Sequence, residues 1–352
     1  MGVKKKGAPT AKKAAPAKPG AAVKKGTAAT KGSRTARRPL GSGPVPHVEI
    51  PRNVNDAALR IGGKDLELTN LDKVFWPDEG YTKRDLLQYY ADVAHVILPH
   101  LRDRAITMKR YPHGITGEFF FMKRAPEHRP RWVETCSIMH KSKSLIAFPL
   151  AQDVPSLLWL INLGCIDLNQ WYGTCDDPDR PHYLHFDLDP GEGAGFGKVL
   201  ETACIVRAAL EEYGMTPLVK TSGSSGVHVY VPIERGPLQK GVWTFAKALA
   251  KRLERKHPEV ITAEYRVAER PHGRVLVDYN QNAWGRTLAS VYSVRPKPRA
   301  TVSTPVTWEE VERGFRMDDF TIETVPTRVR QLGDLWQPLL DTRGRFPLAR
   351  LL

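Results

Sequence analysis

The feature that most restricts the fold of this chain is an alternation, from about residue 55 onward, between short β-rich runs and amphipathic helical segments. Some of the strand-like runs follow one another through helices and others through short loops, which predicts an α/β (α+β) fold with mixed sheets flanked by helices. We expect strands within 105–111, 117–123, 144–150, 182–188, 217–222, 227–233, 274–280 and 289–295, and helices within 82–98, 153–164, 198–213 and 239–256.

Two of the expected helices begin at recognisable capping residues. Thr82 is followed three residues later by Asp85, which is the spacing of a capping box. Asp153 and Pro155 precede an almost wholly apolar segment that reaches Gly164. Both patterns predict helix starts from local chemistry alone.

The positive charge of the chain is concentrated at its beginning. Residues 1–40 hold twelve Lys and Arg and no acid, whereas the whole chain has 53 basic and 38 acidic residues and a net charge of +15. Such a segment buries too little apolar surface to offset its chain entropy. We predict a disordered Lys/Ala/Pro-rich basic tail and linker over 1–46 and one catalytic domain over 47–352. The tail is either an arm that raises the rate of DNA encounter or a solvated extension without a specific partner.

Composition excludes several classes of protein. No run approaches the roughly 18–20 apolar residues of a membrane span, and the first residues lack the apolar core of a secretory signal. The four cysteines form no CxxC pair, which argues against a zinc ribbon and a disulfide scaffold. We therefore expect a protein in the reduced cytoplasm, associated with the nucleoid and not with a membrane, with nucleic acid as its partner.

Two acidic residues in the run 183–190 indicate a site for divalent metal ions. Strand alternation places the apolar residues of this run on one face and Asp187 and Asp189 on the other. Adjacent carboxylates repel unless cations neutralise them, and Mg²⁺ or Mn²⁺ prefers carboxylate oxygens. Aspartates at strand ends also cap turns, so the pattern alone leaves that alternative open.

Asp278 supplies a third acidic residue, at the end of the apolar run 275–277. A charge in this place is costly to bury without a partner. It either forms a salt bridge with Arg274, caps a turn, or completes a site for two metal ions with the other aspartates.

A turn of small residues at 221–226 is suited to phosphate. Its backbone N–H groups and hydroxyls can hold phosphate oxygens. His228 alternates away from its valine neighbours toward the polar side of its strand, and Arg295 can add a guanidinium. The alternatives are a structural histidine and a solvated basic loop at 295–299.

Four segments, HFDLDP (185–190), TSGSSGVHVYVP (221–232), VDYNQNAWG (277–285) and YSVRPKPR (292–299), resemble the archaeo-eukaryotic primase superfamily. More narrowly, residues 55–340 resemble the polymerase domain of bacterial ligase D and its stand-alone relatives. The resemblance implies a two-metal site of Mn²⁺ or Mg²⁺ held by Asp187, Asp189 and Asp278. It also implies nucleotide contacts by Lys109, Ser222, His228, Gln281 and Arg295.

The same resemblance implies contacts with DNA. Asn70, Lys73 and Lys83 match a pocket for the 5′-phosphate at the far side of a gap, and Phe120 and Phe121 match aromatic residues that stack on template bases. Without the resemblance, the two lysines are ordinary surface residues. A run of three phenylalanines is also more often a buried strand, and we expect one of the three to be buried.

The sequence departs from the ligase D pattern at two positions. Asn169 stands where the ligase-linked domains often carry His, and Ser225 where they often carry Lys. The segment 162–169 is more similar to the corresponding segment of the stand-alone relatives associated with ligase C. No ligase or nuclease motif accompanies the domain, so we expect the ligase to be a separate protein.

These observations predict a template-directed DNA/RNA nucleotidyltransferase that extends primers or fills short gaps in DNA repair and favours ribonucleotides. Its expected partners are gapped or primer-template DNA with a 5′-phosphate, nucleoside triphosphates, an ATP-dependent DNA ligase and Ku. Two alternatives stay open. Three aspartates also suit a metal-dependent nuclease or phosphoesterase, and the basic charge suits a non-catalytic DNA-binding repair scaffold.

Overall fold

The computed structural model describes residues 45–139 and 143–352. All but the last two residues of the predicted tail and linker, 1–46, therefore lie outside the described residues. The expected mixed α/β architecture is confirmed. In the described ranges, no helix has both the length and the hydrophobicity needed to cross a bilayer.

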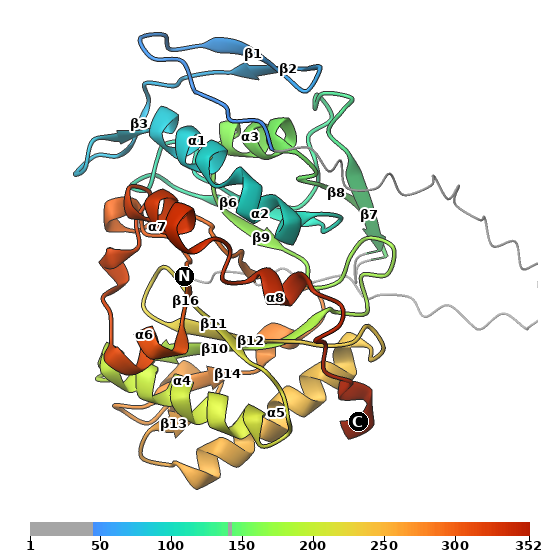
Figure 1. Cartoon of the computed structure of the whole chain (residues 1–352), viewed down its shortest axis with the longest axis vertical. Helices are drawn as coiled ribbons and strands as arrows, with labels where there is room; N and C mark the ends of the chain where they lie inside the picture. The colour runs from blue at the N-terminus through green and yellow to red at the C-terminus, as the bar shows by residue number, and fades with distance from the viewer. Residues whose placement is uncertain (1–44, 140–142) are drawn as a thin grey trace, which may run out of the picture. The chain divides into compact units, whose positions relative to one another are not determined.

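A six-stranded sheet forms one half of the described body, in the order β13-β14-β10-β12-β11-β16. All its neighbours are antiparallel except β13 and β14. Helices α4 (Phe196–Glu211) and α5 (Gln239–Lys256) pack against it, on the side away from α1–α3 (Figure 1). The strands are β10 (Tyr183–Pro190), β11 (Leu218–Thr221), β12 (Val227–Pro232), β13 (Ile261–Thr262), β14 (Val275–Asp278) and β16 (Pro305–Val306).

A four-stranded sheet in the order β15-β9-β5-β6 forms the other half, beside helices α1–α3. Its strands are β5 (Ile106–Arg110), β6 (Phe120–Met122), β9 (Cys165–Gln170) and β15 (Leu288–Ala289). The helices are α1 (Lys83–Asp92), α2 (Ala94–Leu101) and α3 (Val154–Asn162).

The described residues also contain three two-stranded sheets, three short α-helices and five 3-10 helices. The strand pairs are β1 (Ala57–Ile61) with β2 (Lys64–Leu68), β3 (Val74–Trp76) with β4 (Tyr81–Thr82), and β7 (Thr135–Met139) with β8 (Leu145–Pro149). The helices are α6 (Trp308–Arg313), α7 (Thr324–Leu332) and α8 (Gln337–Leu340).

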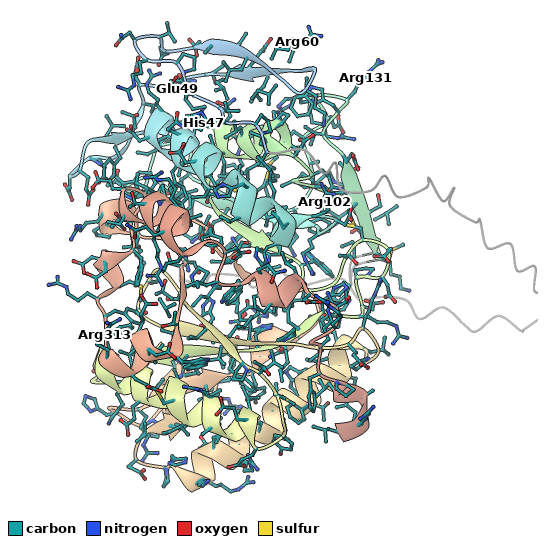
Figure 2. All side chains as sticks on the ribbon, viewed as in Figure 1. His47, Glu49, Arg60, Arg102, Arg131 and Arg313 are labelled. Atoms are coloured by element: carbon teal, nitrogen blue, oxygen red, sulfur yellow. A yellow bond between two sulfur atoms is a disulfide. The ribbon has the colours of Figure 1, made fainter. Side chains whose placement is uncertain are left out.

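Burial follows the alternation along β10. Leu184, Phe186 and Leu188 are completely buried in the main hydrophobic core. Charged side chains such as Arg60, which keeps 73% of its side chain exposed, project from the outside of the body (Figure 2). The apolar face of β10 therefore stabilises the sheet and leaves its opposite face for polar groups.

The predicted capping residues act as expected. Thr82 and Asp85 form a capping box at the start of α1, and Asp153 forms one with Ser156 at the start of α3. The single helix expected over 82–98 is wrong, because Val93 interrupts it and separates α1 from α2.

The strand expected over 289–295 is also wrong. Only its first residue lies in a strand, β15, and Tyr292 has a positive φ of 61°. Val291 and Tyr292 are instead buried in a turn, and Val294 forms an isolated β-bridge with Val302. The Tyr292 hydroxyl donates to Asp334, and the Val294 N–H donates to the Tyr90 hydroxyl. Tertiary packing has overridden the local preference.

The cysteines differ from the reduced state expected from their spacing. Cys136 on β7 and Cys175 form a disulfide across 39 residues of sequence, whereas Cys165 and Cys204 are free. The disulfide lies beside a small second core that contains Phe148 and Trp171. Sequence spacing could not indicate this pair, since only the fold brings the two residues together.

Candidate active site

The register of the six-stranded sheet brings the predicted acidic residues together. Asp187 on β10 lies directly opposite Asp278 on β14, and on its other side it lies opposite His228 on β12. Asp189 follows two residues later on β10 and therefore points to the same face as Asp187. Three carboxylates and an imidazole are thus placed on one face by strand pairing alone.

The proximity of these carboxylates changes their acidity. Repulsion from Asp187, together with burial, raises the pKa of Asp189 to about 7. Burial raises the pKa of Asp187 to about 6, although the positive charges of Lys220 and Arg295 oppose this shift. Burial and the charge of Asp187 also raise the pKa of Asp278. The site therefore holds more negative charge than its own cations neutralise.

The chemistry of the aspartates fits hard divalent cations. Within 45–139 and 143–352, no three acidic, histidine or cysteine side chains are arranged around a common metal position. One of the carboxylates bonds to neighbouring protein groups instead. Asp278 accepts from the Asn280 N–H at 2.7 Å and from Gln281 Nε2 at 3.0 Å. Of the alternatives for Asp278, the turn cap is thus present. Mutual repulsion and oxygen donors nevertheless suit Mg²⁺ or Mn²⁺.

His228 links the acidic face to a buried lysine. Its Nε2 lies 3.1 Å from Oδ1 of Asp187, and its Nδ1 lies 2.8 Å from Nζ of Lys220. Burial, with the charge of Lys220, holds the pKa of His228 well below its usual value. The contact with Asp187 is therefore a hydrogen bond from a neutral imidazole rather than an ion pair.

Lys220 is a residue that sequence reasoning missed. It lies opposite His228 in the register of β11 and β12, is completely buried, and also donates to the Ala289 carbonyl at 3.1 Å and to Ser303 Oγ. Burial lowers the pKa of Lys220 well below its usual value. A lysine between apolar strand residues was a usable sequence signal, because such a charge needs partners.

The turn between β11 and β12 closes against the acidic strand. The Ser222 hydroxyl oxygen accepts from the N–H groups of Ser224 and Gly226, each at 3.1 Å. A side chain at Gly226 would collide with the backbone oxygen of Leu188, so glycine permits this close approach to β10. The turn thereby holds its hydroxyls beside Asp187 and Asp189 in one cavity.

Two predicted basic residues are oriented by Asp167, which sequence reasoning also missed. Its Oδ2 lies 3.5 Å from Nε of Arg295 and 4.0 Å from Nζ of Lys109. The guanidinium of Arg295 also donates to the Ser222 carbonyl at 2.5 Å. Burial raises the pKa of Asp167 against the opposing charges of Arg295 and Lys109. An acid inside the apolar run 165–168 was its only sequence signal.

A cavity of about 450 Å³ lies over these groups, between the two larger sheets. Phe121 and Lys123 extend it toward β6. The cavity is open to solvent and is large enough for a nucleotide-sized ligand. The predicted residues that line it are Lys109, Phe121, Asp187, Asp189, Ser222, His228, Gln281 and Arg295, and Asp278 contacts Gln281 at its edge.

The phenylalanines divide between two sides of β6. Phe121 lines the cavity, with its ring centroid 5.8 Å from Nζ of Lys109, whereas the ring of Phe120 lies 5.3 Å from Cζ of Arg110. Contrary to expectation, no phenylalanine of the run is buried, since Phe119, Phe120 and Phe121 expose 50%, 45% and 61%. The two predicted stacking residues therefore face different surroundings.

Asn70, Lys73 and Lys83 lie apart from the cavity lining, around the β3–β4 hairpin. Lys83 is the first residue of α1 and only 4% exposed, unlike an ordinary surface lysine. Burial, with the charge of Lys73, lowers the pKa of Lys83 to about 8. Its Nζ donates to the Thr69 carbonyl at 2.5 Å.

The two departures from the ligase D pattern have different positions. Asn169 is buried, lines the cavity and donates to the Asp167 carbonyl at 3.3 Å. Ser225 is exposed at the tip of its turn, away from the residues that line the cavity. Only the first departure changes the chemistry of the cavity wall.

Residues 82–336 match the family described as the LigD primase-polymerase domain. The chain is 34% identical over 280 residues to the multifunctional non-homologous end joining protein LigD of Mycolicibacterium smegmatis, covering 78% of this chain and 36% of that protein. It is 32% identical over 269 residues to the bifunctional non-homologous end joining protein LigD of Bacillus subtilis, covering 76% and 43%. The match therefore spans less than half the length of these relatives.

The fold has a counterpart among solved structures. The polymerase domain of Mycobacterium tuberculosis ligase D, solved in complex with DNA, superimposes with a TM-score of 0.73 at 32% sequence identity. The match covers 78% of this chain and 97% of that domain.

Proposed function

The chain belongs to the family of LigD primase-polymerase domains, and we propose that it is a template-directed nucleotidyltransferase that extends primers and fills short gaps in DNA. The observation that carries this proposal is the placement of Asp187 between Asp278 and His228, in a cavity shared with Ser222 and Arg295. Acidic groups for metal ions and basic groups for phosphates meet in one nucleotide-sized space. Such a pairing is what phosphoryl transfer requires.

Asp187, Asp189 and Asp278 would hold two Mg²⁺ or Mn²⁺ ions. The raised pKa values of Asp187 and Asp189, about 6 and about 7, record repulsion and burial that bound cations would relieve. When bound, the ions supply charge neutralisation for the triphosphate and increase the acidity of the primer 3′-hydroxyl.

The basic side of the cavity would bind the triphosphate. Arg295 supplies a guanidinium held between Asp167 and the Ser222 carbonyl, so it is oriented before the nucleotide arrives. The Ser222 hydroxyl is a neutral donor for phosphate oxygens, and the Nε2–H of His228 would be shared between a phosphate oxygen and Asp187, which lies 3.1 Å away. Together these groups would stabilise the negative charge that develops on pyrophosphate as it leaves.

Lys109, Gln281 and Asn169 would contact the remainder of the nucleotide. All three line the cavity, and Gln281 is held by Asp278 at 3.0 Å. We propose that the site favours ribonucleotides. Extension assays that compare both sugars at matched concentration would detect the preference, and equal kcat/KM values would contradict it.

The DNA would lie across β6, between the cavity and the β3–β4 hairpin. Phe121 would stack beside the templating base, and Phe120 would contact DNA on the Arg110 side. Asn70, Lys73 and the buried Lys83 would bind a 5′-phosphate at the far side of a gap. The cellular role would be DNA repair, with an ATP-dependent ligase activity and Ku as partners, as the end-joining function in the names of the relatives suggests.

Primer extension on a gapped duplex tests the proposal. The wild-type chain should add templated nucleotides with Mn²⁺ or Mg²⁺, and Asp187→Asn with Asp189→Asn should abolish addition without loss of folding. Arg60→Gln, on the outside of β1, serves as the matched control. Undiminished extension by the double variant would exclude this site. Metal-dependent cleavage of DNA without added nucleotide would indicate a nuclease instead.

A further inference from the structure

A histidine stands beside the proposed 5′-phosphate pocket. Nδ1 of His113 lies 3.3 Å from Nζ of Lys73, and the side chain of His113 is exposed to solvent. His113 follows β5 in the sequence, whereas Lys73 precedes β3 by one residue. The two residues are therefore brought together from different sheets by the fold.

The loop that carries His113 is anchored to the hairpin. The Ile115 N–H donates to the Phe75 carbonyl at 2.9 Å. Gly114 has a positive φ of 76°, and a Cβ there would lie 2.7 Å from the same carbonyl oxygen. Only glycine allows this approach. The position of His113 next to Lys73 is thus built into the packing of the loop on β3.

Several other charges surround this position. Lys73 and Arg110 both act electrostatically on the buried Lys83, and Asp56 opposes them. Arg110 is held by the Leu163 carbonyl at 2.7 Å, and Asp56 accepts from the Asn70 N–H at 2.8 Å. Three cations thus share one small region with Asp56, whose carboxylate already accepts a backbone hydrogen bond. An anion placed there would be bound by charge as well as by hydrogen bonds.

We propose that His113 is a further contact of the 5′-phosphate, to which it donates a ring N–H. This inference rests on the 5′-phosphate pocket proposed above. Because Nζ of Lys73 carries only donors, Nδ1 of His113 accepts this hydrogen bond, and the ring proton is then on Nε2. A terminal phosphate carries up to two negative charges, whereas an internal phosphodiester carries one. The Nε2–H therefore adds a hydrogen-bond donor to the positive charges that surround a terminal phosphate.

The pH of the experiment matters because other groups in the pocket titrate. Lys83 loses its charge above about pH 8, since its pKa is about 8, and a terminal phosphate takes up a proton below about pH 6. The contribution of His113 is therefore measured at about pH 7, where Lys83 and the phosphate both keep most of their charge.

Binding of fluorescent gapped duplexes, with and without a 5′-phosphate, tests the proposal by anisotropy at about pH 7 without nucleotide. The wild-type chain should bind the phosphorylated duplex more tightly. His113→Leu should reduce the ratio of the two Kd values about three- to fivefold, as expected for the loss of one exposed contact with a charged group. His113→Gln keeps a side-chain N–H and should retain most of the ratio. His95→Asn, on an exposed site of α2, should behave as wild type.

The outcomes separate this inference from the function on which it rests. A wild-type ratio of the two Kd values in His113→Leu would overturn the role of His113, even if Lys73→Ala lost all phosphate preference. No preference in the wild-type chain would overturn both His113 and the pocket. Primer extension with added nucleotide tests the proposed polymerase activity independently of either result.

Discussion

The amino group of Lys220 lies 2.8 Å from Nδ1 of His228, at adjacent positions of two paired strands. With Nδ1 accepting this hydrogen bond, the imidazole proton is on Nε2, which faces Asp187 at 3.1 Å. A completely buried lysine thus selects the tautomer of a histidine in the cavity. In metal sites, residues that do not touch the metal orient its ligands through hydrogen bonds in a similar way.

Lys220→Met should reduce nucleotidyl transfer while leaving the protein folded. Methionine is similar in length but cannot donate to His228, so the imidazole loses its fixed orientation. We expect a decrease in kcat of about 10-fold or more. Activity falls by this amount when residues that hydrogen-bond to the ligands of a metal site are mutated. Because burial of the lysine is itself costly, Tm should stay the same or increase. A decrease of Tm with unchanged kcat would assign Lys220 a structural role only.

Asp189→Asn should stabilise the metal-free protein at pH 8. The folded-state pKa of Asp189, about 7, is raised above its ordinary value of 3.8, mainly by repulsion from Asp187. The stability that this group contributes is therefore complete below pH 3.8 and is lost as the pH rises through 7. Relief of about 1 kcal/mol would raise Tm by roughly 2–4 °C. Thermal unfolding with a chelator at pH 5 and pH 8 measures this, and an equal effect at both values would contradict it.

Affinity for Mn²⁺ should decrease as the pH falls below 7. Both Asp189, with a pKa of about 7, and Asp187, with a pKa of about 6, must lose their protons to bind a cation. We expect the Kd to increase by about tenfold per pH unit for each proton displaced. Calorimetric titration in buffers of different ionisation enthalpy would count these protons, and a Kd independent of pH from 5 to 8 would exclude the carboxylates.

Phe121→Ala and Phe120→Ala should have different effects. Phe121 lines the cavity, and loss of stacking on one base costs roughly 1–3 kcal/mol, so we expect about a tenfold or larger decrease in kcat/KM for the nucleotide. Phe120 lies beside Arg110, and its removal should weaken binding of gapped DNA with little change in nucleotide KM. Steady-state kinetics with anisotropy separates them, and identical changes in both variants would contradict the division.

Removal of residues 1–40 should make DNA binding less sensitive to salt. These residues carry twelve basic side chains and no acidic ones, and each phosphate neutralised contributes about −0.9 to the slope of log K against log salt concentration. We expect weaker binding at low salt and a shallower slope, with kcat at saturating DNA preserved. An unchanged slope would show that the tail does not contact the phosphates.

Local patterns predicted many of the elements. The boundaries of α5, expected over 239–256, agree with the structure, because an amphipathic repeat of 18 residues is a strong periodic signal. The turns at 290–295 were not predictable in this way, since contacts with distant residues such as Asp334 determine them. The pairing of Cys136 with Cys175 has the same origin.

For the site, the sequence by itself determined that Asp187 and Asp189 share one face of a strand, because alternation is a property of the extended backbone. It also supplied the family motifs. Only the tertiary structure placed Asp278 and His228 on either side of Asp187, buried Lys220 behind them, and set His113 against Lys73. These relations join residues separated by up to 91 positions, so they depend on strand order and loop packing, which no local pattern encodes.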